Sequence, residues 1–111
     1  MARSFKLSAD PHARRLALTR IALGYSQQNE YAADAGIAPN TYNPYETGKR
    51  GRLPLDQANK LVQKYGLTLA WIYEGKPGGL ALDLVMKLID LGAMPPDSVP
   101  PGMRPNTQPR R

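Results

Sequence analysis

The segment from Ser26 to Gly48, SQQNEYAADAGIAPNTYNPYETG, restricts the possible fold of this chain more than any other. It predicts a short helix, a tight turn built on Ala35-Gly36-Ile37, and a second helix that closes at Gly48. No stretch of the chain alternates apolar and polar residues for long enough to predict a strand. We therefore predict an all-α fold.

The remaining helices are predicted from proline and glycine positions and from apolar residues at helical spacing. Asp10 can cap the first helix, with Pro11 in its first turn, and Thr68 can cap a short fifth helix. The predicted helices run from Pro11 to before Gly24, from Ser26 or Gln27 to Ala35, from Pro39 to Gly48, from Pro54 to Gly66, after Thr68 to Gly75, and from Leu80 to Leu91.

Composition favours a polyanionic partner. Fifteen Lys and Arg against nine Asp and Glu give a net charge of +6 and an isoelectric point near 9.8. Nucleic acid is the commonest partner of such a chain, although a merely soluble basic protein has the same composition. The absence of Cys excludes a disulfide framework and a thiolate metal site, and the single His12 excludes a multi-histidine site. No cofactor is predicted.

Other classes of protein are disfavoured by what the sequence lacks. No apolar run approaches the roughly 20 residues that a membrane-spanning helix needs, and the first residues lack a signal-peptide core, so we expect no membrane and a cytoplasmic location. No pairing of a nucleophile with a base, metal-ligand cluster or phosphate loop is present, so we do not expect an enzyme.

Several motifs occur in a familiar order between about Ala13 and Gly75. They are Arg20, Gly24-Tyr25-Ser26-Gln27, Gly36-Ile37, Glu46-x-Gly48-Lys49-Arg50 and Tyr65-Gly66-Leu67-Thr68-Leu69-x-Trp71-Ile72-Tyr73. In this combination the chain resembles the Cro/phage-repressor (Xre-type) helix-turn-helix family. The resemblance implies a five-helix phage-repressor-like DNA-binding domain, here with an additional C-terminal helix, that binds double-stranded DNA as a transcriptional regulator.

The resemblance also implies roles for individual residues. Arg20 resembles an arginine of the first helix that pairs with the glutamate matching Glu46, a task suited to the planar guanidinium; two solvated charges are the alternative. Gln27 or Gln28 would contact a phosphate at the start of the second helix. Phosphate contacts are likewise expected from a cluster that could instead be a solvated loop, namely Lys49, Arg50 and Arg52.

The third helix would be the recognition helix. Asn40, Thr41 and Asn43 are expected on its exposed side, and the Asn40 amide can bond the N6/N7 edge of adenine. Tyr42 and Tyr45 match apolar positions of the family, so we interpret them as core residues.

Three features depart from the family pattern. The segment from Ser26 to Gly36 is one residue longer than in the best-known phage repressors, and Pro39 and Pro44 stand where those repressors use long amides to read bases. Pro44 also removes the N–H that would bond the Asn40 carbonyl, at a cost of about 3 kcal/mol. We therefore expect the recognition helix to be divided into one irregular turn and one short turn.

Four segments are predicted: a flexible basic arm (1–9), a helix-turn-helix domain (10–76), a C-terminal helix (79–92) and a disordered Pro-rich basic tail (95–111). In the C-terminal helix only Asp83, Lys87 and Asp90 are polar. A helix so widely apolar either packs on its own core or forms a subunit interface. The second interpretation predicts a homodimer through Leu84, Val85, Leu88 and Leu91.

Two functions remain open from the sequence. The first is a dimeric, repressor-like regulator that binds DNA with strong or weak sequence specificity. The second is a protein-interaction module, such as an antitoxin or a phage adaptor, that uses the same scaffold to bind a protein partner and reads DNA less well. Pro44 and the widely apolar C-terminal helix favour the second function, whereas the net charge of +6 and the cluster of Lys49, Arg50 and Arg52 favour the first.

Overall fold

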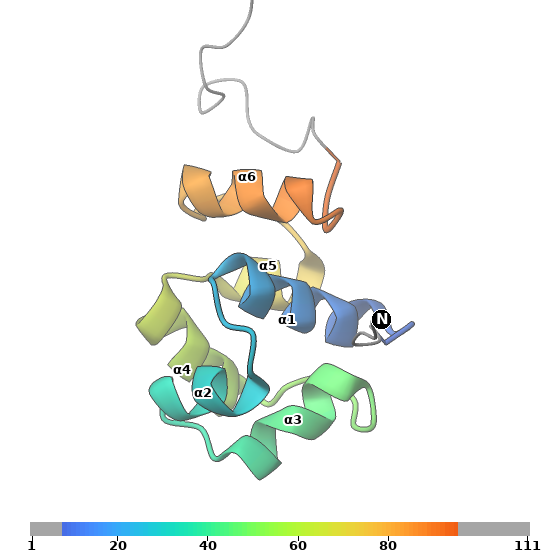
Figure 1. The fold of residues 1–111 in the computed structure, drawn as a ribbon, viewed down its shortest axis with the longest axis vertical. Coiled ribbons are helices and arrows are strands. Elements are labelled where there is room, and N and C mark those ends of the chain that lie inside the picture. Colours follow the sequence, from blue (N-terminus) through green and yellow to red (C-terminus); the bar gives the residue numbers. More distant parts are fainter. Residues whose placement is uncertain (1–7, 96–111) are drawn as a thin grey trace, which may run out of the picture.

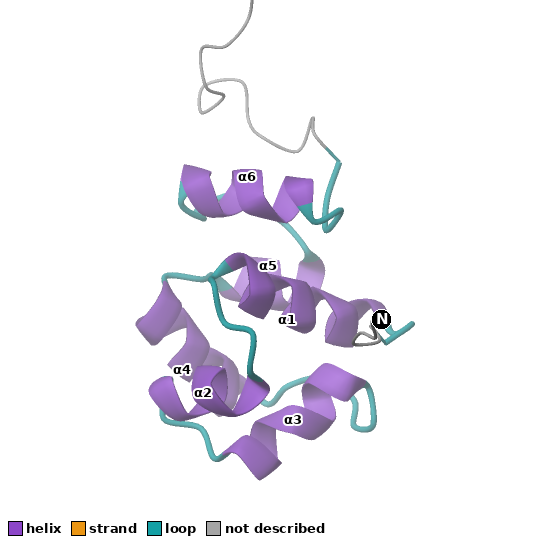
Figure 2. Ribbon diagram, viewed as in Figure 1, coloured by secondary structure: helices purple, strands orange, loops and turns teal. Residues whose placement is uncertain are grey.

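The computed structural model describes residues 8–95, which contain six helices and no strand (Figures 1 and 2). The predicted all-α class is confirmed. Of the predicted arm (1–9) and tail (95–111), all but residues 8, 9 and 95 lie outside the described range. The helices are α1 (Pro11–Ala22), α2 (Gln28–Asp34), α3 (Pro39–Thr47), α4 (Leu55–Tyr65), α5 (Leu69–Glu74) and α6 (Leu82–Asp90).

Side-chain caps fix the start of two helices where the sequence predicted them. The Asp10 carboxylate accepts a hydrogen bond from the Ala13 N–H at 2.9 Å, and the Thr68 hydroxyl accepts one from the Trp71 N–H at 2.9 Å. Each cap satisfies an N–H that has no partner within its helix. α2 is shorter than predicted because Gln27 is still extended, so the helix begins only at Gln28.

A glycine makes the turn between α2 and α3. Gly36 has a φ of +83°, a backbone conformation that costs glycine little because it has no Cβ. The N–H of Ile37 then donates to the Ala32 carbonyl at 2.9 Å, which closes the end of α2. Ile37 itself is buried, so the turn is fixed by packing as well as by hydrogen bonding.

α3 is one continuous helix from Pro39 to Thr47, so the predicted division at Pro44 is wrong. The Asn40 carbonyl loses its helical donor, but Asn40 is exposed in the first turn, where water can replace a missing partner. Tyr42 and Glu46 lie one turn apart on the buried side and hold the helix together across Pro44. Tertiary packing therefore overrides the local preference of proline.

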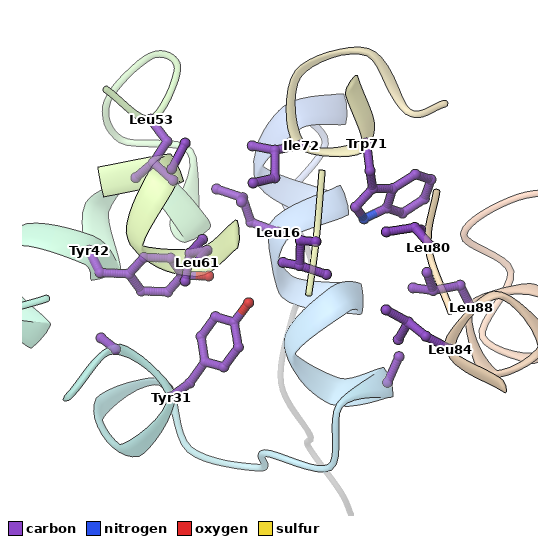
Figure 3. Packing of buried hydrophobic residues seen from close by; sticks show 14 of the residues in the cluster. Leu16, Tyr31, Tyr42, Leu53, Leu61, Trp71, Ile72, Leu80, Leu84 and Leu88 are labelled. Atoms are coloured by element: carbon purple, nitrogen blue, oxygen red, sulfur yellow. The ribbon is translucent and has the colours of Figure 1, made fainter. Parts of the chain in front are cut away.

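α1 is the central helix of the fold. It packs against α3, α5 and α6, and Figure 1 shows it between α6 and the α2–α3 pair. Trp71 of α5 is buried against α1, where its indole N–H donates to the Thr19 hydroxyl at 2.9 Å. Figure 3 shows one continuous apolar cluster on both sides of α1, and its larger members are Leu16, Tyr31, Tyr42, Leu53, Leu61, Trp71, Ile72, Leu80, Leu84 and Leu88.

α6 belongs to this same core. Leu84, Val85 and Leu88 are at most 6% exposed within a single chain. Three of the four residues expected at a dimer seam are therefore already covered by the protein's own core, and that part of the prediction requires correction. Of the four, only Leu91 is exposed, at 37%.

The described residues contain no helix both long enough and apolar enough to span a membrane.

Candidate nucleic-acid interface

A buried ion pair joins α1 to the end of α3. The Arg20 Nε atom donates to the two carboxylate oxygens of Glu46 at 3.1 and 3.0 Å, and Nη2 lies 3.0 Å from Oε1. Their side chains are 5% and 1% exposed, so this is not a pair of solvated surface charges. The pair implied by the family resemblance is therefore present in the structure.

Two further side chains complete the environment of Glu46. Gln28 of α2 donates to Oε1 at 2.7 Å, and Tyr42 of α3 donates to Oε2 at 2.8 Å. Arg20 also donates from Nη1 to the Tyr25 carbonyl at 2.8 Å. Burial raises the pKa of Tyr42 well above its ordinary value, which keeps its hydroxyl a donor. We call Arg20, Gln28, Tyr42 and Glu46 the Glu46 cluster; it fixes α1, α2 and α3 relative to one another.

The Glu46 cluster changes the role expected for Gln28. The amide nitrogen of Gln28 donates a hydrogen bond to Glu46 within the protein, whereas Gln27 is exposed and makes no capping bond.

The sequence analysis did not identify Tyr42 as a partner of Glu46. The available signal was their spacing of four residues, which places two side chains on one side of a helix.

The outward side of α3 carries polar groups. Asn40 and Thr41 are exposed in its first turn. Asn43 is only partly exposed, and its Nδ2 atom donates to Oδ1 of Asn29 on α2 at 3.1 Å. Pro39 and Pro44 interrupt this row with groups that cannot donate a hydrogen bond.

The loop after α3 holds the three predicted cations in two different ways. Lys49 and Arg50 are exposed directly beyond the end of the helix. Arg52 is exposed too, but its Nη2 atom donates to the Tyr73 carbonyl at 2.6 Å and its guanidinium lies 5.4 Å from the centre of the Tyr73 ring. Arg52 therefore helps to attach the loop to α5.

His12 fixes the far end of this loop. Its Nε2 atom accepts from the Leu53 N–H at 3.0 Å, and its Nδ1 atom lies 3.2 Å from the Ile72 carbonyl. These two bonds define a neutral imidazole with its proton on Nδ1. Burial lowers the pKa of His12, and the positive charges of Arg15 and Arg52 lower it further, against the opposing effect of the Ile72 bond. Sequence reasoning gave His12 no structural role.

A concave depression of about 680 Å³ lies between α1, the start of α2 and the second half of α3. Three members of the Glu46 cluster, Arg20, Gln28 and Glu46, line it. Its lining residues are Ser8, Ala17, Arg20, Ile21, Ser26, Gln27, Gln28, Asn29, Asn43, Glu46 and Thr47. The described residues bring together no group of three His, Asp or Glu side chains that could hold a metal ion.

Two helices joined by a glycine turn, with polar side chains on the second and cations beyond it, are the features of a helix-turn-helix domain. The chain matches the Helix-turn-helix family over residues 16–72, which is more than half of its length. It therefore belongs to this family, of the Xre/Cro type, whose domains are DNA-binding and regulatory. No curated protein and no solved structure gives a significant match.

Proposed function

We propose that this protein is a transcriptional regulator of the repressor type that binds double-stranded DNA through α2, α3 and the loop after α3. α3 enters the major groove with Asn40 and Thr41 toward the bases. The Asn40 amide has the donor and the acceptor that pair with adenine N7 and N6. The proposal extends the family assignment to named residues of this chain.

The observation that carries the proposal is the position of Lys49 and Arg50 at the end of α3, where the backbone N–H groups of both donate to the Pro44 carbonyl at 2.9 and 3.2 Å. Both are exposed within four residues of Glu46, which is held by three other side chains. Cations attached to a rigid helix end can meet phosphates in one register, which a flexible basic loop cannot do. The net charge of +6 adds an attraction that does not depend on DNA sequence.

A salt series tests the phosphate contacts. The affinity for a random duplex should fall linearly in a plot of log K against log salt concentration, because bound cations release counterions. Lys49→Ala and Arg50→Ala should each flatten the slope by about 0.9. Lys64→Ala, an equal loss of charge at an exposed position on α4, is the matched control and should leave the slope nearly unchanged. Equal effects at all three positions would contradict the assignment.

Selection from a random DNA pool tests sequence readout. Pro39 and Pro44 provide no side-chain donor, so we expect a short preferred site that depends on Asn40. Asn40→Ala should remove the preference at one base pair, worth about 1–3 kcal/mol of discrimination, and leave binding to random duplex largely intact. A wild-type preference that survives in Asn40→Ala would show that other residues read the bases.

We further propose that two copies bind half-sites about 34 Å apart, as dimeric members of this class do. Leu91 is the one predicted interface residue that stays exposed in the single chain. Sedimentation with a palindromic duplex should show two protein chains per duplex. One chain per palindrome at saturation would contradict the dimer.

A protein-interaction module is the second candidate, and it is supported by the two prolines on α3. It predicts that wild type binds random duplex no better than the Lys49→Ala, Arg50→Ala double variant. The breadth of the apolar surface of α6 no longer supports it, because Leu84, Val85 and Leu88 are buried within the chain.

A further inference from the structure

An open groove lies between the end of α1 and the last turn of α6. Its volume is about 320 Å³, and its lining residues are Ile21, Ala22, Gly24, Lys87, Asp90 and Leu91. Of these, only Ile21 also lines the depression beside α2 and α3. None of the residues that we assign to DNA belongs to this groove, so it is a separate surface of the protein.

The groove combines open space with an exposed apolar side chain. Ala22 and Gly24 are its smallest lining residues, and a Cβ atom built on Gly24 would meet no atom within 4 Å. Leu91 follows directly on α6 and is 37% exposed, whereas Leu84 and Leu88 of that helix are buried. A space lined by small residues can receive a leucine from a facing helix, as a hole receives a knob. Here the space and the leucine occur on the same surface.

Two opposite charges also lie on this surface. Lys87 and Asp90 are exposed and stand three residues apart on α6. Neither belongs to an ion pair within residues 8–95. In a contact between two copies related by a two-fold axis, each residue that contacts a second residue of the partner is contacted by it in return. Lys87 of each copy can therefore pair with Asp90 of the other, which gives two ion pairs from one rim.

We propose that this groove is an interface between two copies of the chain, in which Leu91 of each copy enters the groove of the other and Lys87 pairs with Asp90 across the two-fold axis. The inference deepens the proposed function and rests on it in one respect, since it assigns the surface through which two DNA-bound copies meet. Figure 1 shows α1 between α6 and the α2–α3 pair, so a contact through α6 leaves α3 free to bind DNA.

The size of the groove sets the expected strength of the contact. Its six lining residues are far fewer than the roughly 20–30 residues that each partner contributes to a standard interface. We therefore expect a weak dimer in solution, with a Kd of micromolar order, that is strengthened when two half-sites hold both copies on one duplex.

Reversal of the two charges tests the ion pairs. Lys87→Asp alone and Asp90→Lys alone each place like charges opposite one another, so each should raise the dimer Kd at least about tenfold in sedimentation equilibrium. A mixture of the two variants should associate again, because every contact between unlike copies then joins opposite charges. Recovery on mixing would also show that both variants are folded. Lys64→Asp, an equal change of charge at an exposed position on α4, is the matched control and should leave the dimer Kd unchanged.

Truncation of the leucine tests the apolar contact. Leu91→Ala should raise the dimer Kd about tenfold, because the buried area of the leucine side chain is lost. Leu55→Ala removes the same atoms from a leucine of α4 that is 56% exposed and lies outside the groove, and it should have no effect. On a palindromic duplex Leu91→Ala should reduce the cooperativity between two bound chains and keep the affinity for a single half-site.

Three outcomes would overturn the inference. They are a wild-type chain that stays monomeric at high micromolar concentration and binds a palindrome without cooperativity, charge variants that do not associate when mixed, or equal effects of Leu91→Ala and Leu55→Ala. The first would show that something other than a second copy covers the groove. All three leave the affinity for one half-site, and with it the proposed DNA binding, intact. Failure of the wild type to bind any duplex would overturn the proposed function instead, while sedimentation without DNA would still test the interface.

Discussion

At the scale of single residues, His12 makes stability depend on pH. Folding uses the neutral imidazole, and burial lowers its pKa below the ordinary 6.5. The unfolded chain then binds the proton more readily than the folded one. The contribution of His12 to the free energy of unfolding is therefore fully present above pH 6.5, and it is lost as the pH falls from 6.5 toward the lowered pKa of the folded state. The charges of Arg15 and Arg52 also lower the pKa of His12, whereas the charge of Asp10 raises it.

Melting curves of the wild type and His12→Gln between pH 8 and pH 5 would check this prediction. The wild type should lose stability across the acid part of the range, and the variant should lose less. Parallel curves for the two proteins would contradict a role for His12 in the pH dependence. The loop carrying Lys49 and Arg50 should loosen first, because His12 binds the N–H of Leu53 at its end.

Tyr31 has a buried hydroxyl without a hydrogen-bond partner among the described residues. An unsatisfied buried polar group costs about 1–3 kcal/mol. Tyr31→Phe should therefore keep or raise the melting temperature. Tyr65→Phe is the matched substitution with the opposite expected sign, because the Tyr65 hydroxyl donates to the Tyr31 carbonyl at 2.6 Å. Denaturant unfolding of both variants would test the two predicted changes in stability. A lower stability of Tyr31→Phe would show that the Tyr31 hydroxyl has a hydrogen-bond partner.

Residue identities alone could predict only part of this site. The pairing of Arg20 with Glu46 followed from the family pattern, because both residues stand at positions that the family uses. The hydrogen bond from Gln28 to Glu46 could not be predicted. It depends on α2 beginning at Gln28 rather than Gln27, a one-residue difference in a segment that is longer than in the best-known repressors.

At the scale of helices, the Glu46 cluster should control how α1, α2 and α3 are joined. Glu46→Gln leaves the buried Arg20 charge uncompensated, and Arg20→Met leaves a buried carboxylate with only the Gln28 and Tyr42 donors. Each change should lower the free energy of unfolding by about 3–5 kcal/mol. A double-mutant cycle in denaturant would measure the coupling, and additive losses would show that the pair contributes little.

Pro44 should still destabilise α3, even though the helix is continuous. Pro44→Gln restores the N–H opposite the Asn40 carbonyl, and one such hydrogen bond contributes about 1 kcal/mol. The melting temperature should therefore rise. The added amide should also strengthen the preference among DNA sequences if α3 lies in the major groove. A fall in melting temperature would show that the proline ring itself contributes to packing against a neighbour.

The prediction of a break at Pro44 was wrong for a general reason. Helix propensity acts within a few residues, whereas the burial of Tyr42 and Glu46 depends on α1 and α2. The helix starts at Pro11 and after Thr68 were correctly predicted because a cap is itself a local interaction. Local signals thus locate helix ends well, but they do not decide whether a helix continues under tertiary packing.

At the scale of the whole molecule, α6 should unfold together with the helix-turn-helix. Leu88 is fully buried in the common core, so Leu88→Ala should cost about 2–5 kcal/mol. Met86, on the same helix but 37% exposed, provides the control, and Met86→Ala should cost much less. Unfolding followed by circular dichroism and by fluorescence should give one coincident transition. Two separate transitions would show that α6 is an independent unit.

The sequence could not decide whether α6 packs on its own core or forms a subunit interface. The breadth of an apolar surface does not indicate what covers that surface. The leucines of α6 fit a subunit interface and an internal core equally well. The deciding factor is the position of α1, which offers α6 a surface on the side away from α3 (Figure 1). That position is a property of the assembled fold and has no local sequence signal.

Trp71 is the one tryptophan of the chain, and it sits where α1 and α5 meet. An indole that is 1% exposed and bonded to Thr19 emits at short wavelength, and its emission moves to the red when water reaches it. Asn40, Thr41 and Lys49 are on the exposed surface, so a bound duplex would not touch the indole. The fluorescence of Trp71 should therefore report folding and should not change when DNA binds. A single labelled-duplex titration can follow occupancy through the label while Trp71 reports whether each variant is still folded.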